Sequence, residues 1–137
     1  MQSELFEKGL VVRKEVLGNE YVEKSIKGAD DFSLAMQEFA TETAWGMIWT
    51  RPGLPRKTRS LLNVGLTTAF RCSHETKVHI RGALNNGATR EEIRAVLMQV
   101  MMYAGILAVR EAVRGANQVF AEEDAKLKKL KKKKSAK

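Results

Sequence analysis

The sequence predicts an all-α protein with a single folded domain. Apolar residues recur at intervals of three and four along several segments, and no segment of useful length alternates as a β-strand does. Signals for helix ends separate these segments: Pro52 and Pro55 lie between two of them, and Gly87 follows a third. The length of 137 residues suits one domain. We therefore expect a helical bundle.

Three helices are expected in the N-terminal part of the chain. The first covers residues 5–17, and a short second one around residues 21–26 ends before Gly28. Asp30 or Asp31 can cap a longer third helix. This helix should end before Pro52, because a proline pushes the preceding residue out of the α region. The apolar positions that recur at three and four residues along it are Phe32, Met36, Phe39, Ala40, Thr43 and Met47.

Four more helices are expected after the turn at residues 51–55. Pro55 suits the first position of the fourth helix, where no backbone donor is missed. The fifth covers residues 72–85 and ends at Gly87, which can adopt a left-handed conformation. Thr89 opens the sixth with a capping box, and the last helix runs from Ile106 into the tail. Three methionines of this region indicate an adaptable core or a subunit interface: Met98, Met101 and Met102.

The positive charge of the chain is confined to its C-terminal tail. The net charge is +8, but residues 126–137 hold eight lysines and no acid, so residues 1–125 carry 24 − 8 = 16 bases against 16 acids. We expect a neutral domain over residues 1–125 and a lysine-rich tail over residues 126–137. The tail can be a solvated extension that continues the last helix and then frays, or it can bind nucleic-acid phosphates. Nucleic acid is the less expected partner, because no aromatic residue in the tail could stack on bases.

The composition predicts a cytoplasmic location and no membrane segment. Cys72 is the only cysteine, so the chain cannot form an internal disulfide, and the N-terminus lacks the apolar run of a signal peptide. The longest apolar stretch, residues 93–113, is interrupted by Arg94, Gln99 and Arg110. Such a stretch is too polar to span a bilayer.

Titratable groups gather between residues 71 and 79. At 100° per residue, Cys72, Glu75 and His79 fall within about 60° on one helix face, so they can line one pocket wall. His74 and His79 are five residues apart, whereas two metal ligands on a helix need a spacing of four, so we expect no metal site. A solvated position is the simpler interpretation of His74. Cys72 is more commonly a small buried hydrophobe than a reactive thiol, and without a second sulfur a dithiol peroxidase is disfavoured.

Bulky aromatics and arginines surround the turn that precedes the fourth helix. Trp45 and Trp49 lie before this turn, Arg51 lies within it, and Arg59 follows it. Arginine presents a planar fork of donors that binds carboxylates in pairs. The pattern therefore indicates a site for an anionic substrate, although charge alone equally allows ion pairs with glutamates.

The same residues resemble the γ-carboxymuconolactone decarboxylase family, in the alkylhydroperoxidase-D-like superfamily. The resemblance covers roughly residues 7–120. It implies a bundle of about six helices and a homo-oligomer, either a trimer or a hexamer, with pockets near the subunit contacts. The motifs are WGMIWTRPGL at residues 45–54, RSLL at 59–62, HE at 74–75, HIRGALNNGAT at 79–89, EEI at 91–93 and YAG at 103–105.

The chain departs from both branches of this superfamily at single positions. The peroxidase branch carries Cys-x-x-Cys-x-x-x-His, and here Glu75 replaces the second cysteine while His79 is retained. The decarboxylase branch commonly has an acidic residue where this chain has Cys72. The first departure supports a decarboxylase, and the second leaves the identity of its substrate open.

The resemblance implies decarboxylation of 4-carboxymuconolactone to 3-oxoadipate enol-lactone without a cofactor. His79 would donate the proton, and Glu75 would orient or share that proton. Candidates for holding the substrate carboxylates are Arg51, Arg59 and Arg71. The further candidates for contact with the substrate are Trp45 and Trp49, which would exclude water, and Cys72 and His74.

Two other functions stay open at this point. The chain can be a family member that decarboxylates or isomerises a different cyclic acid, with Cys72 reshaping the pocket. It can also be a nucleic-acid-binding module that acts through its lysine tail.

Overall fold

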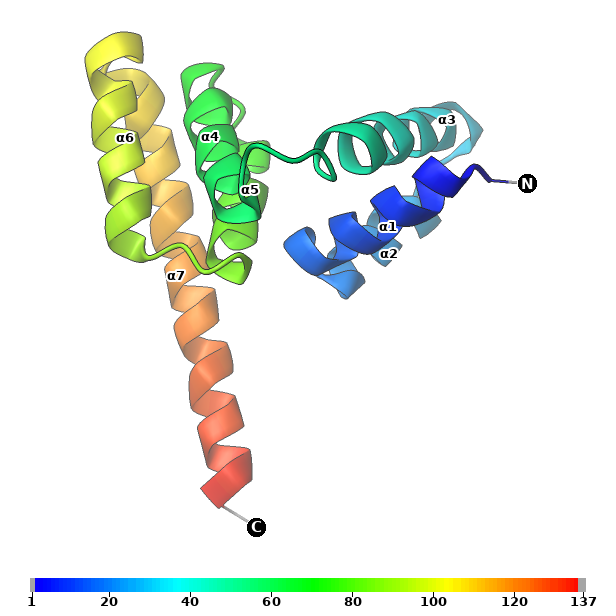
Figure 1. Ribbon diagram of the computed structural model, residues 1–137. Helices are drawn as coiled ribbons and strands as arrows, with labels where there is room; N and C mark the ends of the chain where they lie inside the picture. The colour runs from blue at the N-terminus through cyan, green and yellow to red at the C-terminus, as the bar shows by residue number, and fades with distance from the viewer. Residues whose placement is uncertain (1, 136–137) are drawn as a thin grey trace.

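The computed structural model describes residues 2–135, and every regular element in this range is helical (Figure 1). The all-α prediction is therefore confirmed. Residues 2–135 contain seven α-helices, the number expected from the periodicity and one more than the about six that the resemblance implies, and a π-helix continues the third. Residues 136 and 137 of the expected tail lie outside the described range. The elements are α1 (Glu4–Leu17), α2 (Asn19–Lys27), α3 (Asp31–Ala40), η1 (Thr41–Ile48), α4 (Arg56–Ala69), α5 (Ser73–Asn85), α6 (Arg90–Ala104) and α7 (Ile106–Ser135).

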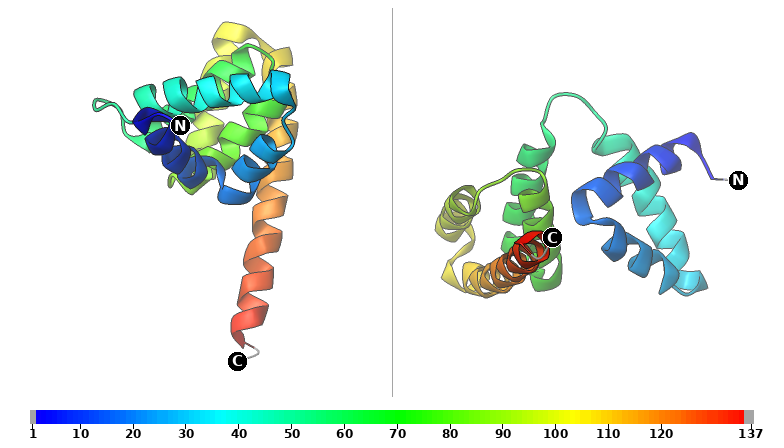
Figure 2. Two further views of the ribbon diagram at one scale, coloured as in Figure 1. Left: turned by 90° about the vertical axis from the view of Figure 1, so that its right-hand side faces the viewer. Right: turned by 90° about the horizontal axis from the view of Figure 1, so that it is seen from below.

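The helices form two lobes that stand apart (Figures 1 and 2). The N-terminal lobe contains α1, α2, α3 and η1, and the helices α4 to α7 form a bundle. Residues 49–55 connect the lobes, and α1 packs against α5 across the junction. At this junction the Asn85 side chain donates a hydrogen bond to the Val16 carbonyl at 2.8 Å, and Arg56 pairs with Glu15 at 2.6 Å. The lobes therefore meet along a narrow seam.

Within the N-terminal lobe, α1 and η1 cross with their backbones in direct contact. A Cβ atom added to Gly9 would lie 2.1 Å from the Thr41 carbonyl oxygen, and one added to Gly46 would lie 2.2 Å from the Leu5 carbonyl oxygen. Neither distance leaves room for any side chain. Two glycines are therefore required where these helices cross.

A buried arginine joins α1 to the start of η1. Arg13 is only 7% exposed, and its guanidinium donates to the Thr41 hydroxyl at 2.9 Å and to the Gln37 side-chain oxygen at 2.6 Å. Burial lowers the pKa of Arg13. The Thr41 hydroxyl also donates to the Gln37 carbonyl at 2.7 Å. The Thr41 hydroxyl thus competes with the helix's own backbone amides for a carbonyl at the point where the α-helix becomes a π-helix.

The π-helix corrects the prediction of one continuous α-helix up to residue 47. The Trp49 amide donates to the Ala44 carbonyl, five residues earlier, at 2.9 Å. Trp45 and Trp49 stack with ring centroids 4.7 Å apart and planes inclined by 22°. The stacked pair forms part of the N-terminal core, which consists of Val12, Val16, Leu17, Val22, Trp45, Trp49 and Val78.

Most of the predicted helix ends are confirmed. The Asp30 carboxylate caps α3 by accepting the Ser33 amide at 2.9 Å, and Thr89 forms the capping box of α6. Gly87 follows α5 with a φ of +84°. Two helix starts shift by one residue, because Pro55 and Cys72 are the N-cap residues of α4 and α5 and lie outside the helices.

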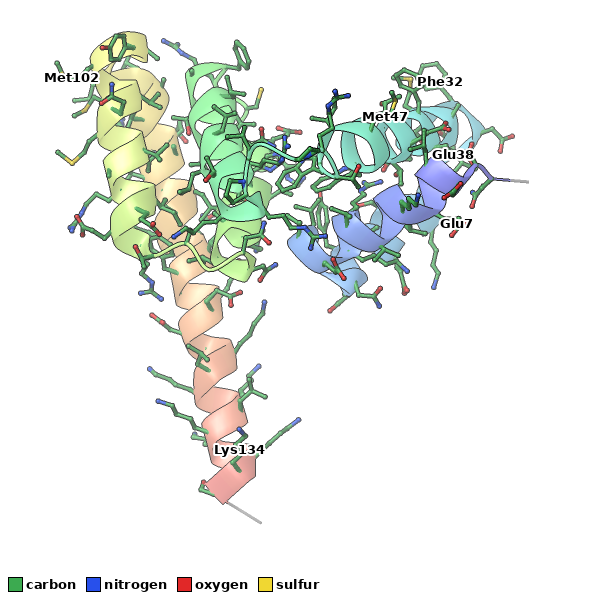
Figure 3. The ribbon with its side chains drawn as sticks, in the orientation of Figure 1. Glu7, Phe32, Glu38, Met47, Met102 and Lys134 are labelled. Carbon is green, nitrogen blue, oxygen red and sulfur yellow. The ribbon has the colours of Figure 1, made fainter. Side chains whose placement is uncertain are left out.

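The apolar face predicted on the third helix is present but does not point into the lobe. Phe32 is 86% exposed, Met36 and Phe39 are each 62% exposed, and Met47 is 45% exposed. Figure 3 shows Phe32 and Met47 on the side of α3 and η1 that faces away from α1. Helical periodicity identifies an apolar face correctly, but it does not say whether the same chain covers it.

The bundle is held by its own core, and α7 extends well beyond it (Figure 1). Arg90 pairs with Asp124 of α7 at 2.6 Å, and the helix then continues to Ser135, so the described part of the tail is the end of the last helix. No helix in residues 2–135 combines the length and the apolarity that a membrane crossing requires. The buried core residues of the bundle are Val64, Ile80, Ala83, Ala88, Ile93, Leu97, Val109, Ala112, Ala116 and Val119.

The glycine crossing generates a stability prediction. Gly9→Ala and Gly46→Ala should each lower the free energy of unfolding by about 1–3 kcal/mol or more, because the added methyl group overlaps backbone atoms. Gly115→Ala is the matched control, since its Cβ would meet only the movable side chain of Lys77 and no backbone atom. It should be neutral or stabilising by up to about 1 kcal/mol. Urea unfolding at one fixed protein concentration measures all three, and a wild-type midpoint for Gly9→Ala would contradict the backbone contact.

Candidate functional site

The residues predicted to form the site come from the segment that joins the two lobes. Trp45 and Trp49 lie in and after η1, Arg51 lies in the connection, and Arg59 lies in the first turn of α4. The remaining candidates follow on α5 and just before it. Both tryptophans are buried in the N-terminal core, where they pack with Val78 of α5. The site is therefore built where the lobes meet.

His79 occupies the junction between the two hydrophobic cores. Its neighbour Val78 packs into the N-terminal core, whereas Ile80 packs into the core of the bundle. The imidazole is half-buried, and its Nδ1 atom is buried without a hydrogen-bond partner among the described residues. A buried polar atom without a partner requires an explanation, and a ligand that supplies the partner is one.

The environment of His79 sets its charge. Burial lowers the pKa of His79, and the Glu75 carboxylate, one helical turn earlier, opposes this effect only in part. The imidazole is therefore mainly neutral at pH 7 in the unliganded chain. An anion placed next to it would favour the protonated form and raise this pKa again.

The other residues of the expected pocket wall are more exposed. Glu75 and His74 are exposed, which agrees with the solvated position considered for His74. Cys72 is half-buried, with its sulfur 3.6 Å from the Phe70 carbonyl oxygen. Arg71 is exposed and has a φ of +59° at the turn between α4 and α5. The expected common face thus runs from solvent at Glu75 to the interior at His79.

Arg51 and Arg59 are linked and hold no carboxylate of the described chain. The Arg59 guanidinium donates from Nη2 to the Arg51 carbonyl at 2.8 Å, while its Nε is buried without a partner. Neither arginine pairs with an acid within residues 2–135, in contrast to Arg56 of the same segment, which pairs with Glu15. The ion-pair alternative therefore holds for Arg56, whereas no acid of residues 2–135 occupies the donors of Arg51 or those that Arg59 does not use on the Arg51 carbonyl.

One chain does not enclose this site. Glu75 and His79 line none of the five main cavities of residues 2–135, of which the largest, about 440 Å³, lies between α6 and α7. Within the described range, no three side chains of the metal-binding types gather into a cluster. The arrangement can bind an anion through arginine donors and exchange a proton through His79.

Two polar anchors of the site region were not anticipated from the sequence. The Thr76 hydroxyl, buried on α5, lies 3.1 Å from the Thr67 hydroxyl of α4 and fixes the turn that precedes His79. Arg13 fixes α1 against η1. A signal for Arg13 was available, because it falls within the periodic buried face that contains Gly9, Val12 and Val16.

Comparison with known proteins places the chain among decarboxylases. Residues 35–118 match the model of the carboxymuconolactone decarboxylase family. The chain is 38% identical to a 4-carboxymuconolactone decarboxylase of Acinetobacter baylyi over 85% of its length and 87% of that protein. It is 47% identical to the nitrosuccinic acid decarboxylase npaB of Metarhizium robertsii over 80% of its length and 76% of that protein. An uncharacterized 15.0 kDa protein of Paracoccus denitrificans is 38% identical over 61% of the chain and 63% of that protein.

The matched region begins within α3 and ends within α7, so it contains the π-helix, the connection and the α5 segment with Glu75 and His79. The chain belongs to the carboxymuconolactone decarboxylase family.

Proposed function

We propose that this protein is a cofactor-independent decarboxylase of a small dicarboxylate, with 4-carboxymuconolactone as the leading substrate and 3-oxoadipate enol-lactone and CO2 as the products. The observation that carries the proposal is the half-buried imidazole of His79 with its unpartnered Nδ1, next to arginines that hold no carboxylate. The named activities of the two decarboxylase relatives support it.

The substrate itself supplies the electron sink for this reaction. When the bond to the carboxylate carbon breaks, CO2 departs and the electron pair enters the ring double bond and the lactone carbonyl, which gives a dienolate. A proton then adds to the ring carbon. The protein has to hold the anion, exclude water and deliver that proton.

The residues of the site can be assigned to these tasks. Arg51 and Arg59 bind the carboxylate that stays, and Arg71 can reach a second carboxylate from the turn before α5. His79 becomes protonated when the anionic substrate binds, donates the proton to the ring carbon and recovers it from solvent. Glu75 stabilises the imidazolium from one turn away. Five residues complete the wall of the pocket: Trp45, Trp49, Cys72, His74 and Val78.

A second candidate substrate is nitrosuccinic acid. The relative named for it has the higher identity of the two, 47% against 38%, and Cys72 departs from the acidic residue common in the lactone branch. Nitrosuccinic acid is also a dicarboxylate with a built-in electron sink, because a nitro group next to the leaving carboxylate accepts the electron pair. The same arginines and the same proton donor would serve both reactions.

We further propose a cytoplasmic homo-oligomer, either a trimer or a hexamer, in which residues 1–125 form the catalytic body and residues 126–137 an appendage. The exposed apolar side chains support oligomerisation, since a lone subunit would leave Phe32, Met102 and Tyr103 each more than three-quarters exposed. Binding of nucleic acid by the tail is not required for this function.

The substrate assignment is tested by incubating the purified protein with each acid separately. We expect 4-carboxymuconolactone to lose CO2, which proton NMR follows through the enol-lactone product. Conversion of nitrosuccinic acid alone would establish the second candidate in its place. If neither acid releases CO2 while the protein is folded and assembled, the proposed function is wrong.

The proton donor is tested with His79→Gln and His79→Ala. Each should lower kcat by a factor of about 10² to 10⁴, the usual contribution of a general acid. Arg114→Gln is the control, because this exposed side chain of α7 pairs only with Glu111 of its own helix at 2.7 Å. Folded His79 variants with wild-type turnover would contradict the assignment.

The pH dependence follows from the lowered pKa of His79. If the protonated imidazole donates, kcat/KM should fall as the pH rises through this pKa, which lies below the ordinary value of about 6.5. The bound anion raises the pKa, so kcat should show the same fall at higher pH. His79→Gln should remove both. A kcat/KM that falls instead as the pH is lowered through this range would identify His79 as a base.

A further inference from the structure

We propose that copies of this chain associate head to tail, with the apolar stripe of α3 and η1 from one copy seated in the groove between α4 and α6 of the next. The stripe consists of Phe32, Met36, Phe39 and Met47. The inference rests on the homo-oligomer of the proposed function and names the two surfaces that meet.

The stripe is long, apolar and unpartnered within its own chain. Its four side chains are between 45% and 86% exposed. Phe32 and Met47 lie on the face of α3 and η1 opposite α1 (Figure 3), and Met36 and Phe39 share this face by helical spacing. Taking about 150–250 Å² for a large apolar side chain, they expose on the order of 500 Å². This approaches the roughly 800 Å² that each partner buries in a stable interface.

The groove between α4 and α6 has matching chemistry. It is a shallow, open depression of about 410 Å³, and none of its lining residues is charged. Its floor is formed at Gly65, where a missing side chain leaves Val96 and Val100 as the nearest neighbours. The absent side chain lets an apolar side chain from outside approach these valines more closely than it could approach a larger residue. The lining consists of Thr58, Leu61, Leu62, Gly65, Leu66, Val96, Gln99 and Val100.

The edge of the groove carries a second ridge with the same spacing as the stripe. Leu62 and Leu66 of α4 and its C-cap residue Phe70 are 51%, 44% and 73% exposed and follow one another at intervals of four. Phe32 and Met36 show this interval on α3. Helices commonly pack by interlocking ridges formed at intervals of four residues, and both surfaces are apolar and carry this interval.

The occupant of the groove has to be another copy. Within one chain α3 makes its main contacts with η1 rather than with the bundle, and the four side chains of the stripe keep 45% to 86% of their surface exposed. A second copy fills the groove and covers the stripe with one type of contact. In a pair of copies, one copy still has a free stripe and the other a free groove. Further copies can therefore add through the same contact until a ring closes.

This contact would also complete the proposed site. The ridge on α4 ends at Phe70, directly before Arg71 and Cys72, and Arg59 precedes Leu62 by one turn. A helix of the next copy laid along α4 therefore lies against the exposed side of the site. It would shield Glu75 from solvent and provide the enclosure that a single chain lacks.

The test uses two variants at exposed positions, where a change should not disturb the fold of a single chain. The stripe variant carries Phe32→Glu and Met36→Glu, and the groove variant carries Leu62→Glu and Leu66→Glu. Leu127→Glu with Leu130→Glu is the matched control, since these side chains of α7 are 54% and 56% exposed. Light scattering after size exclusion gives the mass of each, and far-ultraviolet circular dichroism checks the fold.

We expect the wild type and the control to be oligomers, and each variant alone to have a lower mass. An equimolar mixture of the two variants should form one-to-one pairs, because one intact stripe can still enter one intact groove. A monomeric wild type, variants with wild-type mass, or a mixture that does not pair would overturn the proposal. The masses require no substrate, so they distinguish a failure of this contact from a failure of the proposed activity.

Discussion

The contact between the backbones of α1 and η1 determines how this molecule is arranged. Because Gly9 and Gly46 carry no side chain, the two helices approach until carbonyl oxygens occupy the space that a Cβ would need. This approach brings the Arg13 guanidinium to Thr41 and holds the stacked tryptophans against α1. Helix α1 also packs against α5. The two glycines therefore help to set where the candidate residues on α5 lie relative to the connecting segment, although neither glycine belongs to the candidate site.

Much of the fold was accessible from the sequence because it depends on local signals. The caps at Asp30 and Thr89 act within one turn of backbone, so residue type and spacing were enough to predict them. The π-helix was not predictable in this way, because it depends on Thr41 meeting a guanidinium from another helix. The orientation of the stripe that contains Phe32 could not be predicted either, since helical periodicity locates an apolar face without identifying what covers it.

The candidate site was also predictable only where local helix geometry determines it. Spacing placed Glu75 and His79 on one face, and the structure agrees, because the geometry within a helix is fixed. The depth of that face, with Glu75 in solvent and His79 half-buried, is set by packing against two cores and could not be derived from spacing. The sequence also could not show that Arg51 and Arg59 form no ion pair with nearby acids, because charge composition does not say which charged residues meet. The enclosure of the site depends on surfaces outside one chain.

The free end of α7 separates the solubility of the protein from its activity. Residues 1–125 are electrically balanced, and the whole excess of +8 resides in the lysines that follow. Protein molecules with a net charge near zero associate and precipitate readily, whereas a positively charged helix end on each molecule keeps the molecules apart by electrostatic repulsion. A protease that cuts within this lysine run would remove the positive charge and leave the residues of the candidate site in place. The shortened protein would then have a net charge near zero at neutral pH. It would keep the residues of the candidate site but would precipitate more readily.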